Sequence, residues 1–461
     1  MIKNKFKILL IFILVVSILF FCVIKWELIH IFNSTDHITL RKASRNLDLP
    51  NILLIGVDTL RADHLKCYGY SKNTSSNIDR LAQKGVLFRN TISQIPLTNP
   101  SFTSIFTSLY PHEHGAQNGI PPHNEFITLP EILKKHGFIT AAFISGYPLI
   151  AKISGLQRGF DLYNDKLTKN FRKNFSTENT DRTADETTDL AIKWLTNNKD
   201  KRFFLWIHYY DPHTPYIPPA PYNKLFLNEK KKSINIQPEK DFNFYISQYD
   251  GEIAYTDSYI GNLLKKLEML GIRKRTLILF ISDHGESLTE HNDYFDHGLY
   301  LYDEQIKVPF IISYPSSVPE NKIIDSQVRC IDLMPTLLNL LGIPIPKQAR
   351  GVSLVPLIFG EQKKLQLEAY SETSTKNISL DRFSVRYEES KFIYTSNTKV
   401  KELYNIEKDP NELVNIIDEN LNKAKDLEKR LFNWISEYKI EPKRKILDNV
   451  KKTLRSLGYF Q

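Results

Sequence analysis

The chain has 461 residues, which is enough for one large globular domain and a smaller one. Hydrophobic residues make up 42% and charged residues 25%, so a disordered or fibrous protein is excluded. The net charge of +9 allows an anionic partner, but the lysines are scattered and no recognition motif is present, so we expect no nucleic-acid binding. The three cysteines, Cys22, Cys67 and Cys330, are too few for a disulfide framework and lack metal-site spacing.

An apolar segment near the N-terminus predicts a membrane anchor. Residues 8–24 contain no charged side chain and follow several lysines; a spanning helix needs at least about 17 residues. The alternatives are a buried helix and a cleaved signal peptide, but no small-residue cleavage site follows at Lys25 and Trp26. The positive-inside rule keeps the lysines in the cytoplasm. We therefore predict a single-pass protein of the cytoplasmic membrane, with residues 1–26 as stub and transmembrane helix, 27–49 as spacer and the rest extracytoplasmic.

From residue 51 onward, short apolar runs alternate with amphipathic stretches. This pattern predicts βαβ units around a mostly parallel sheet. The runs are continuous rather than alternating, as expected for strands that are covered on both faces. The expected strands are residues 52–57, 139–144, 203–207, 277–281 and 308–312. The expected helices are residues 78–85, 184–197, 251–270 and 332–341.

The pattern changes past about residue 360. Two shorter alternating runs, 384–387 and 391–396, precede a charged helical segment at 420–438. These predict a small antiparallel sheet with a helix packed on it, so we divide the chain into a domain at 50–360 and a C-terminal subdomain at 361–461. Exposed insertions are expected at residues 164–186 and 228–240.

Three residues with metal-binding side chains directly follow predicted strands. Asp58 follows one strand, and Asp283 and His284 follow another. Ligands bind at the carboxyl ends of parallel strands, so these side chains should meet at one edge of the sheet. Two carboxylates and an imidazole suit zinc or manganese, with calcium possible although it prefers oxygen ligands. Singly, Asp58 could cap a helix and Asp283 could be a turn residue; together the three predict one divalent metal ion.

Thr98 lies in the segment Pro-Leu-Thr-Asn-Pro-Ser, between the two groups of predicted ligands. Asn99 is a good helix cap and Pro100 a good first helical residue, so Thr98 should lie at a helix N-terminus. The helix dipole and free amides there favour an anion, either a bound phosphate or sulfate or the ionised Thr98 hydroxyl. Metal coordination would add to that activation. The alternative is that Thr98 only caps the helix.

These motifs make residues 51–416 resemble the sulfatase family of the alkaline-phosphatase superfamily. The matching segments are residues 57–63 with 68–69, 98–115, 208–216, 282–286, 297–309, 331–336 and 403–410. The resemblance implies an α/β, alkaline-phosphatase-like fold, in which helices sandwich a mostly parallel sheet. It also implies a metal-dependent hydrolase of sulfuric or phosphoric esters.

The resemblance also implies roles for individual residues. Thr98 occupies the nucleophile position and contacts the metal ion. His213 matches a histidine that contacts the substrate group or leaving oxygen, and His297 matches a Lys or His with the same role. The implied metal ligands are Asp58, Thr98, Asp283 and His284.

Three further polar residues of the matching segments have less definite roles. We expect His208 and Asp211 to support the site or the fold. Glu286 would orient His284 or another residue of the site, or face solvent.

The sequence departs from sulfatases proper at the nucleophile. Those enzymes carry Cys or Ser, which becomes formylglycine, and an Arg in the same motif; here the residues are Thr98 and Phe102. Thr cannot become formylglycine, so we expect no such cofactor. Residues 145–148, Ser-Gly-Tyr-Pro, replace a paired Lys and His of many sulfatases. These departures favour phosphoryl chemistry. A Thr nucleophile with one acidic ligand before it and an Asp-His pair after it resembles the site of the phosphoethanolamine and glycerophosphate transferases of the superfamily.

The predicted mechanism is attack by Thr98 on phosphorus, with His213 or His297 protonating the leaving oxygen. Water or an acceptor hydroxyl then resolves the covalent intermediate. The substrate would be a sulfate or phosphate ester, and the anchor suggests a lipid head group or an envelope glycan. The alternatives are a phosphoethanolamine-type transferase, a true sulfuric ester hydrolase and a non-catalytic binding protein.

Overall fold

The computed structural model describes residues 49–169, 179–227, 241–315, 317–375, 380–437 and 446–457. The predicted anchor, nearly all of the spacer and the insertion predicted at 228–240 lie outside the described residues. Among the helices of the described part, none is both long and apolar enough to cross a membrane.

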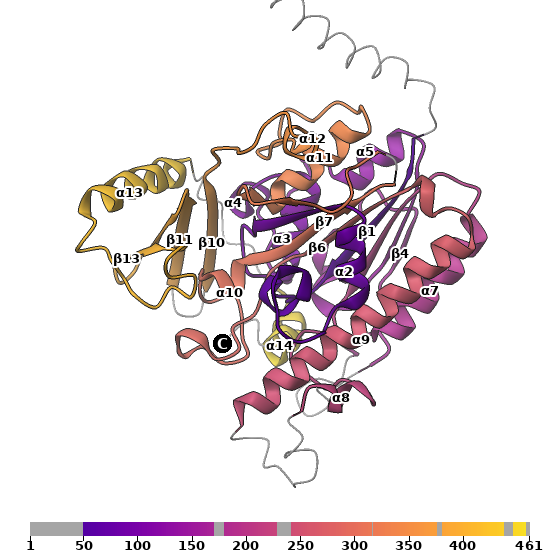
Figure 1. Ribbon diagram of the computed structural model, residues 1–461, viewed down its shortest axis with the longest axis horizontal. Coiled ribbons are helices and arrows are strands. Elements are labelled where there is room, and N and C mark those ends of the chain that lie inside the picture. The colour runs from indigo at the N-terminus through magenta and orange to yellow at the C-terminus, as the bar shows by residue number, and fades with distance from the viewer. Residues whose placement is uncertain are drawn as a thin grey trace, which may run out of the picture. The chain divides into compact units, whose positions relative to one another are not determined.

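A nine-stranded sheet forms the centre of the molecule (Figure 1). Its strand order is β4-β3-β5-β1-β6-β7-β2-β8, and β9 also pairs with β2. The middle of the sheet consists of β3 (Ile139–Phe143), β5 (Phe203–Tyr209), β1 (Asn51–Val57), β6 (Thr276–Ser282) and β7 (Lys307–Ser313). The flanking strands are β4 (Leu162–Asn164), β2 (Val86–Ile92), β8 (Lys322–Ile324) and β9 (Val328–Arg329).

The sheet is mostly parallel, as predicted, and each predicted strand is present. β1 runs parallel to both β5 and β6, whereas β7 runs antiparallel to β6 and β2. The sequence pattern missed β2, because Arg89 and Asn90 interrupt its apolar residues and the strand is irregular there.

Helices cover both faces of the sheet. On one face, Leu53, Ile55 and Val57 of β1 pack in one apolar cluster with α2 (Ser76–Gln83), α7 (Ala184–Asn198) and α9 (Phe242–Met269). On the other, Phe102 of α3 meets Trp206 of β5 at a ring-centroid distance of 5.0 Å. The remaining longer helices here are α3 (Thr98–Thr107), α5 (Leu129–Lys135) and α11 (Leu333–Leu340). The shorter ones are α4 (Pro111–His114), α6 (Ala151–Ser154), α8 (Tyr222–Leu225), α10 (Asp303–Ile306) and α12 (Val355–Phe359).

Helix α9 begins at Phe242 rather than at the predicted Gly251. Its cap is Asp241, whose carboxylate accepts a hydrogen bond from the Asn243 amide at 3.1 Å. Gly251 lies inside the helix, at a point where another segment packs closely against the helix backbone. A Cβ at Gly251 would lie 2.8 Å from Cγ of Pro218, so this glycine allows close approach rather than ending a helix.

Of the exposed insertion predicted at 164–186, residues 170–178 lie outside the described residues, and the described residues are partly buried. Arg182 is 1% exposed, and its guanidinium donates to Asn164 Oδ1 at 2.7 Å and to the Ile144 carbonyl. The polar composition suggested exposure, but this side chain satisfies polar groups just beyond β3 and at β4.

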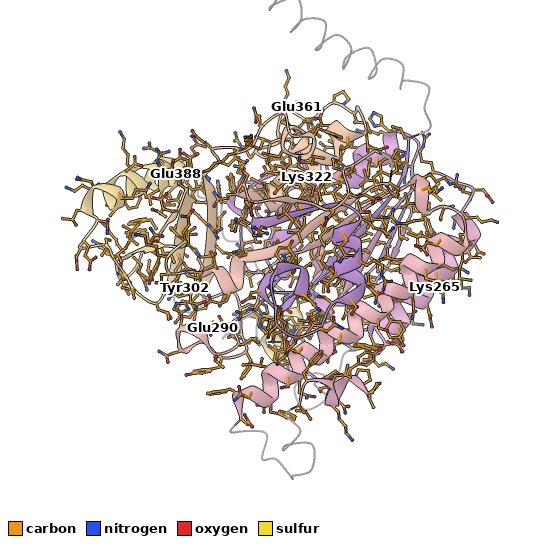
Figure 2. All side chains as sticks on the ribbon, in the orientation of Figure 1. Lys265, Glu290, Tyr302, Lys322, Glu361 and Glu388 are labelled. Atoms are coloured by element: carbon orange, nitrogen blue, oxygen red, sulfur yellow. The ribbon has the colours of Figure 1, made fainter. Side chains whose placement is uncertain are left out.

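The predicted C-terminal sheet and helix are present. The four antiparallel strands are β10 (Ala369–Thr375), β11 (Leu380–Tyr387), β12 (Ser390–Thr395) and β13 (Val400–Asn405). Helix α13 (Leu421–Ser436) lies on this sheet (Figure 1), and its Leu427 and Leu431 pack against Val385 and Phe392. Tyr302, which is labelled in Figure 2 and directly precedes α10, contacts the C-terminal sheet. Its hydroxyl donates a hydrogen bond to Glu402 of β13 at 2.8 Å.

An unpredicted helix, α14 (Asp448–Ser456), follows α13 in the chain and packs against residues around the larger sheet. Its Val450 and Leu454 belong to an apolar cluster with Tyr147 and Leu97. Leu97 immediately precedes Thr98, so the last described helix helps to pack the segment that carries the predicted nucleophile.

Candidate active site

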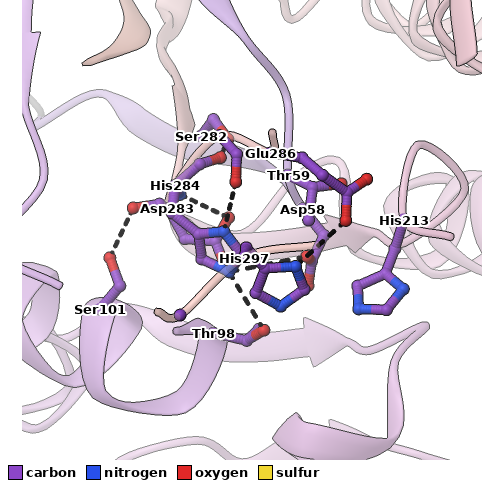
Figure 3. A network of polar contacts seen from close by, with 12 residues as sticks. Asp58, Thr59, Thr98, Ser101, His213, Ser282, Asp283, His284, Glu286 and His297 are labelled. Atoms are coloured by element: carbon purple, nitrogen blue, oxygen red, sulfur yellow. Dashed lines mark hydrogen bonds and ion pairs between the residues drawn. The ribbon is translucent and has the colours of Figure 1, made fainter. Parts of the chain in front are cut away.

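The structure brings three of the four predicted metal ligands, Asp58, Asp283 and His284, together at one edge of the sheet (Figure 3). Asp58 directly follows β1, and Asp283 and His284 directly follow β6. β1 and β6 pair in register, so their ends coincide. All three side chains are fully buried, and one ligand atom from each lies within 4.8 Å of the other two.

The donor set of these three residues fits a divalent cation. Nδ1 of His284 lies 2.8 Å from the Gly285 carbonyl, so this nitrogen carries the proton and Nε2 presents its lone pair. That Nε2 is 3.5 Å from Oδ2 of Asp283 and 3.9 Å from Oδ1 of Asp58. Oδ2 of Asp283 is buried, and no hydrogen-bond donor among the described residues reaches it. A cation would satisfy all of these acceptors.

The pKa values of the three side chains also fit a cation-binding site. Burial raises the pKa of Asp58 well above its ordinary value, and the negative charges of Asp283 and Glu286 raise it further. Burial likewise raises the pKa of Asp283. Burial lowers the pKa of His284 to about 4, which keeps this imidazole neutral and able to act as a ligand.

Thr98 lies at the N-terminus of a helix, as predicted, because it is the first residue of α3. Its Oγ1 is 3.5 Å from Nε2 of His284, which places the predicted nucleophile beside the metal ligands. The predicted cap was wrong, since Leu97 flanks the helix and Asn99 is its second residue. Pro100 is tolerated in the first turn because an amide there has no partner within the helix.

Serine hydroxyls connect the segments that carry the site. Ser282 Oγ accepts from the Leu60 amide at 3.1 Å and donates to the His284 carbonyl at 2.8 Å. Ser101 Oγ donates to the Asp283 carbonyl at 2.8 Å. These roles were not predicted, although the positions of both serines beside predicted site residues could have indicated them.

The residue after Asp58 has a strained backbone. Thr59 has a φ of 52°, a left-handed conformation that is rare for a β-branched residue and costs about 1–3 kcal/mol. The Tyr249 hydroxyl donates to the Thr59 carbonyl at 2.7 Å and accepts from the Arg61 amide at 3.0 Å. These contacts hold the turn that presents Asp58.

Of the two predicted substrate-contacting histidines, His297 adjoins the predicted ligand His284, and His213 adjoins His297 (Figure 3). The ring centroid of His297 is 4.5 Å from that of His284 and 5.1 Å from that of His213. Glu286 is fully buried, and its Oε1 lies 3.1 Å from Nδ1 of His297 while its Oε2 accepts from the Tyr216 hydroxyl. Of the alternatives for Glu286, the structure therefore favours orientation of His297 and excludes a solvent-facing side chain.

His208 and Asp211 have different positions. Nε2 of His208 is 3.4 Å from Oδ2 of Asp58, so this histidine contacts a predicted ligand directly. Burial lowers the pKa of His208 to about 3, and the nearby Arg182 charge adds to this shift, so the imidazole is neutral. Asp211 is structural, because its Oδ1 accepts from the Ala184 amide at 2.9 Å, at the start of α7.

An apolar side chain fills the position at which sulfatases carry arginine. Phe102 is fully buried, with its ring centroid 5.0 Å from that of Trp206 and 5.2 Å from that of His208. The chain therefore lacks, at this position, the arginine that could contact a substrate anion.

Comparisons with known proteins agree with this architecture. A family model described as Sulfatase matches residues 50–343, and one described as N-sulphoglucosamine sulphohydrolase, C-terminal, matches residues 289–440. A Delta 4,5-hexuronate-2-O-sulfatase of Bacteroides thetaiotaomicron is 25% identical over 418 residues, covering 81% of this chain and 86% of that protein. An arylsulfatase of Clostridium perfringens is 27% identical over 438 residues, covering 80% and 90%.

Solved structures show the same fold. A phosphonate monoester hydrolase of Agrobacterium radiobacter superposes with a TM-score of 0.71 at 22% identity, covering 85% of this chain and 96% of that one. A protein solved in complex with its substrate, D-glucosamine-2-N,6-O-disulfate, superposes with a TM-score of 0.72 at 23% identity, covering 85% and 98%.

Proposed function

The chain belongs to the sulfatase family and is an ester hydrolase, and we propose that it acts on phosphoric esters with Thr98 as nucleophile. The observation that carries the proposal is the position of Thr98. This residue begins α3, and its Oγ1 lies 3.5 Å from Nε2 of His284, in the site that Asp58 and Asp283 complete. A threonine cannot form formylglycine, so its own hydroxyl is the available nucleophile.

The groups around Thr98 have different roles in the proposed reaction. A divalent cation bound by Asp58, Asp283 and His284 would supply positive charge beside the transferring group. The positive end of the α3 dipole favours the ionised Thr98 hydroxyl and the negative oxygens of that group.

Hydrolysis then proceeds in two displacements. The Thr98 oxygen bonds to phosphorus as the bond to the leaving oxygen breaks, and His213 or His297 gives that oxygen a proton. Water then attacks phosphorus and gives a proton back to that histidine as the bond from phosphorus to Thr98 breaks, which releases phosphate and restores ionised Thr98. Glu286 accepts from Nδ1 of His297, so Nε2 of His297 is the nitrogen that exchanges protons with the substrate.

Hydrolysis of sulfate esters is the second candidate. The sulfatases that match most of the chain favour it. The substrate would then be a sulfated sugar or aryl sulfate, attacked by Thr98 or by water. Phe102 argues against this candidate, because its apolar ring occupies the place of the arginine that assists formylglycine chemistry.

A substrate panel separates the two candidates. The full chain is assayed with an aryl phosphate monoester, a diester, a phosphonate and an aryl sulfate, each with zinc, manganese or calcium. We expect turnover of a phosphorus ester; preference for the aryl sulfate would establish the second candidate. Transfer of the phosphorus-containing group to an added alcohol would instead identify a transferase.

Two variants test the nucleophile. Thr98→Ala should lower kcat by at least about 10³-fold and leave no covalent adduct on the peptide that contains residue 98. Thr98→Ser should retain part of the activity. Metal analysis of both variants distinguishes loss of the nucleophile from loss of the cation. Full activity of Thr98→Ala would end the assignment.

The same proposal places the enzyme outside the cytoplasmic membrane. Its support is the charge-free apolar segment at residues 8–24 with lysines before it, and the polar residues up to 49 as a spacer. The spacer reaches at most about 70 Å, which favours lipid head groups or envelope glycans as substrates. Protease treatment of intact spheroplasts should degrade the catalytic part; protection from protease would contradict this location.

A further inference from the structure

Gly146 lies in the segment that replaces the paired Lys and His of many sulfatases. Its backbone is extended, with a φ of −125° and a ψ of 142°, so its conformation does not require glycine. A Cβ at this position, however, would lie 2.5 Å from Cδ2 and 2.9 Å from Cγ of Tyr210. The absence of a side chain therefore makes room for the Tyr210 ring.

The Tyr210 ring stacks on His213. The two ring centroids are 4.4 Å apart, the rings are inclined by 20°, and each residue is 3% exposed. His297 meets the same imidazole edge-on, with an interplanar angle of 79°. His213 is thus held by a flat ring on its face and by a second imidazole at an angle to it.

Backbone contacts complete this arrangement. The His213 amide donates to the Tyr210 carbonyl at 2.9 Å, so the stacked residues also form one turn. Nδ1 of His213 lies 2.6 Å from the Thr214 carbonyl and donates to it, which leaves Nε2 to exchange a proton with the substrate. The imidazole cannot turn about its side-chain bonds without displacing the Tyr210 ring.

We propose that Tyr210 is a positioning residue that holds His213 for proton transfer to the leaving oxygen, and that Gly146 admits the Tyr210 ring to that place. This inference rests on the proposed function, in which His213 is one of the two histidines that give the leaving oxygen a proton, and assigns that role to His213. Tyr210 acts through His213 and forms no bond with the reacting atoms. Its aromatic ring, rather than its hydroxyl, performs this role.

Kinetics of four variants test the proposal. Tyr210→Leu should lower kcat roughly 10- to 100-fold with little change in KM, because displacement of a proton-transferring group costs up to about 100-fold. Gly146→Ala should have a similar effect, and Tyr210→Phe should retain most of the activity. In a His213→Ala background, Tyr210→Leu should cause no further loss.

Tyr370→Leu is the matched control. Tyr370 stacks on Trp434 at 4.8 Å in the C-terminal subdomain, so this variant loses an aromatic stack whose ring partners, Trp434 and Tyr110, are not site residues. It should unfold at a lower temperature and keep its kcat per folded molecule. Equal kcat losses in Tyr210→Phe and Tyr210→Leu, or additive losses with His213→Ala, would overturn the proposal.

A second measurement does not depend on enzyme activity. Diethyl pyrocarbonate modifies accessible imidazoles, and peptide mass spectrometry gives the rate for His213. Tyr210→Leu and Gly146→Ala should raise this rate severalfold, whereas Tyr210→Phe should not. Absence of turnover on every ester would refute the proposed function alone, while unchanged modification rates in all variants would refute the role of Tyr210.

Discussion

Two groups of buried carboxylates in this protein differ in how their charge is balanced. The metal rim contains Asp58, Asp283 and His284. The other group, the charge cluster, contains Asp303, Arg386, Lys391 and Glu412 and connects α10 to the C-terminal sheet. Lys391 is fully buried, with its Nζ 3.0 Å from Oδ1 of Asp303 and 2.9 Å from Oε1 of Glu412.

The pKa values of Asp303 in the charge cluster and Asp58 in the metal rim shift in opposite directions, whereas burial raises the pKa of Glu412 to about 7. Burial raises the pKa of Asp303, but the charges of Arg386 and Lys391 outweigh burial and hold it below the ordinary value. At the metal rim, burial and neighbouring carboxylates both raise the pKa of Asp58. The charge cluster therefore carries its own cations and serves stability, whereas the rim has a deficit that a bound cation would remove.

The largest effect should come from neutralising the metal rim. Asp58→Asn should abolish metal binding and lower activity by at least about 10³-fold, equivalent to about 4 kcal/mol. In the presence of a chelator, its unfolding free energy should equal or exceed that of the wild type, because a poorly compensated buried charge is removed.

Metal analysis, kinetics and urea unfolding check this prediction. Asp325→Asn is the control, since that carboxylate is 69% exposed and pairs with Arg89 at the surface. A large loss of stability in chelated Asp58→Asn would contradict the charge deficit of the rim.

The charge cluster should respond in the opposite way. Lys391→Met leaves Asp303 and Glu412 buried without their shared cation, so unfolding free energy should fall by about 3 kcal/mol. The metal content and the kcat per folded molecule should be unchanged. Lys401→Met breaks the partly exposed pair with Glu428 and should cost less than about 0.5 kcal/mol. Equal losses in the two lysine variants would remove the distinction between the cluster and a surface ion pair.

Metal removal should destabilise the wild type by a smaller amount. A cation at 100 times its dissociation constant adds about 2.7 kcal/mol of stability if it binds only the folded state. Thermal unfolding with and without chelator measures this shift, which should disappear in Asp58→Asn. A shift of equal size in that variant would mean that the metal ion binds elsewhere.

The smallest effect concerns Glu290, which pairs with Arg61 at 2.8 Å next to the metal rim. Burial raises the pKa of Glu290, but Arg61 outweighs burial and the result is about 2. The pair therefore stabilises the fold fully above pH 4.5, the ordinary pKa of glutamate, and this stabilisation is lost as pH falls toward 2.

Glu290→Gln should thus cost about 1 kcal/mol at pH 7, since the carboxylate is 31% exposed and partly screened by solvent. Urea unfolding at pH 7, 4.5 and 3.5 should show a difference from wild type that shrinks only below pH 4.5. A difference that stays constant down to pH 3.5 would contradict the pKa assignment.

Much of the site could be predicted because of its place in the chain. Continuous apolar runs indicate buried strands, and the carboxyl ends of parallel strands share an edge. Such strands are followed directly by Asp58, Asp283 and His284. Their positions in the chain, right after strands of one sheet, therefore determine that these side chains lie close together. The helix that begins at Thr98 was predictable for the same reason, although its cap was not.

The partners of buried polar and small residues depended on the tertiary structure. Glu286 could have faced several neighbours, and only the folding of residues 286–297 places it at His297. Gly251 resembled a helix start because the approach of Pro218 cannot be seen along the chain.

The amino-acid sequence by itself determined the sheet, the metal rim and the position of Thr98. The tertiary structure alone decided which charges are balanced and which residues hold His213 and His297. Lys391 lies 88 positions from Asp303, and Gly146 is far along the chain from Tyr210. Periodicity reports burial within one element, whereas such contacts arise when separate elements pack and each buried group finds its partner.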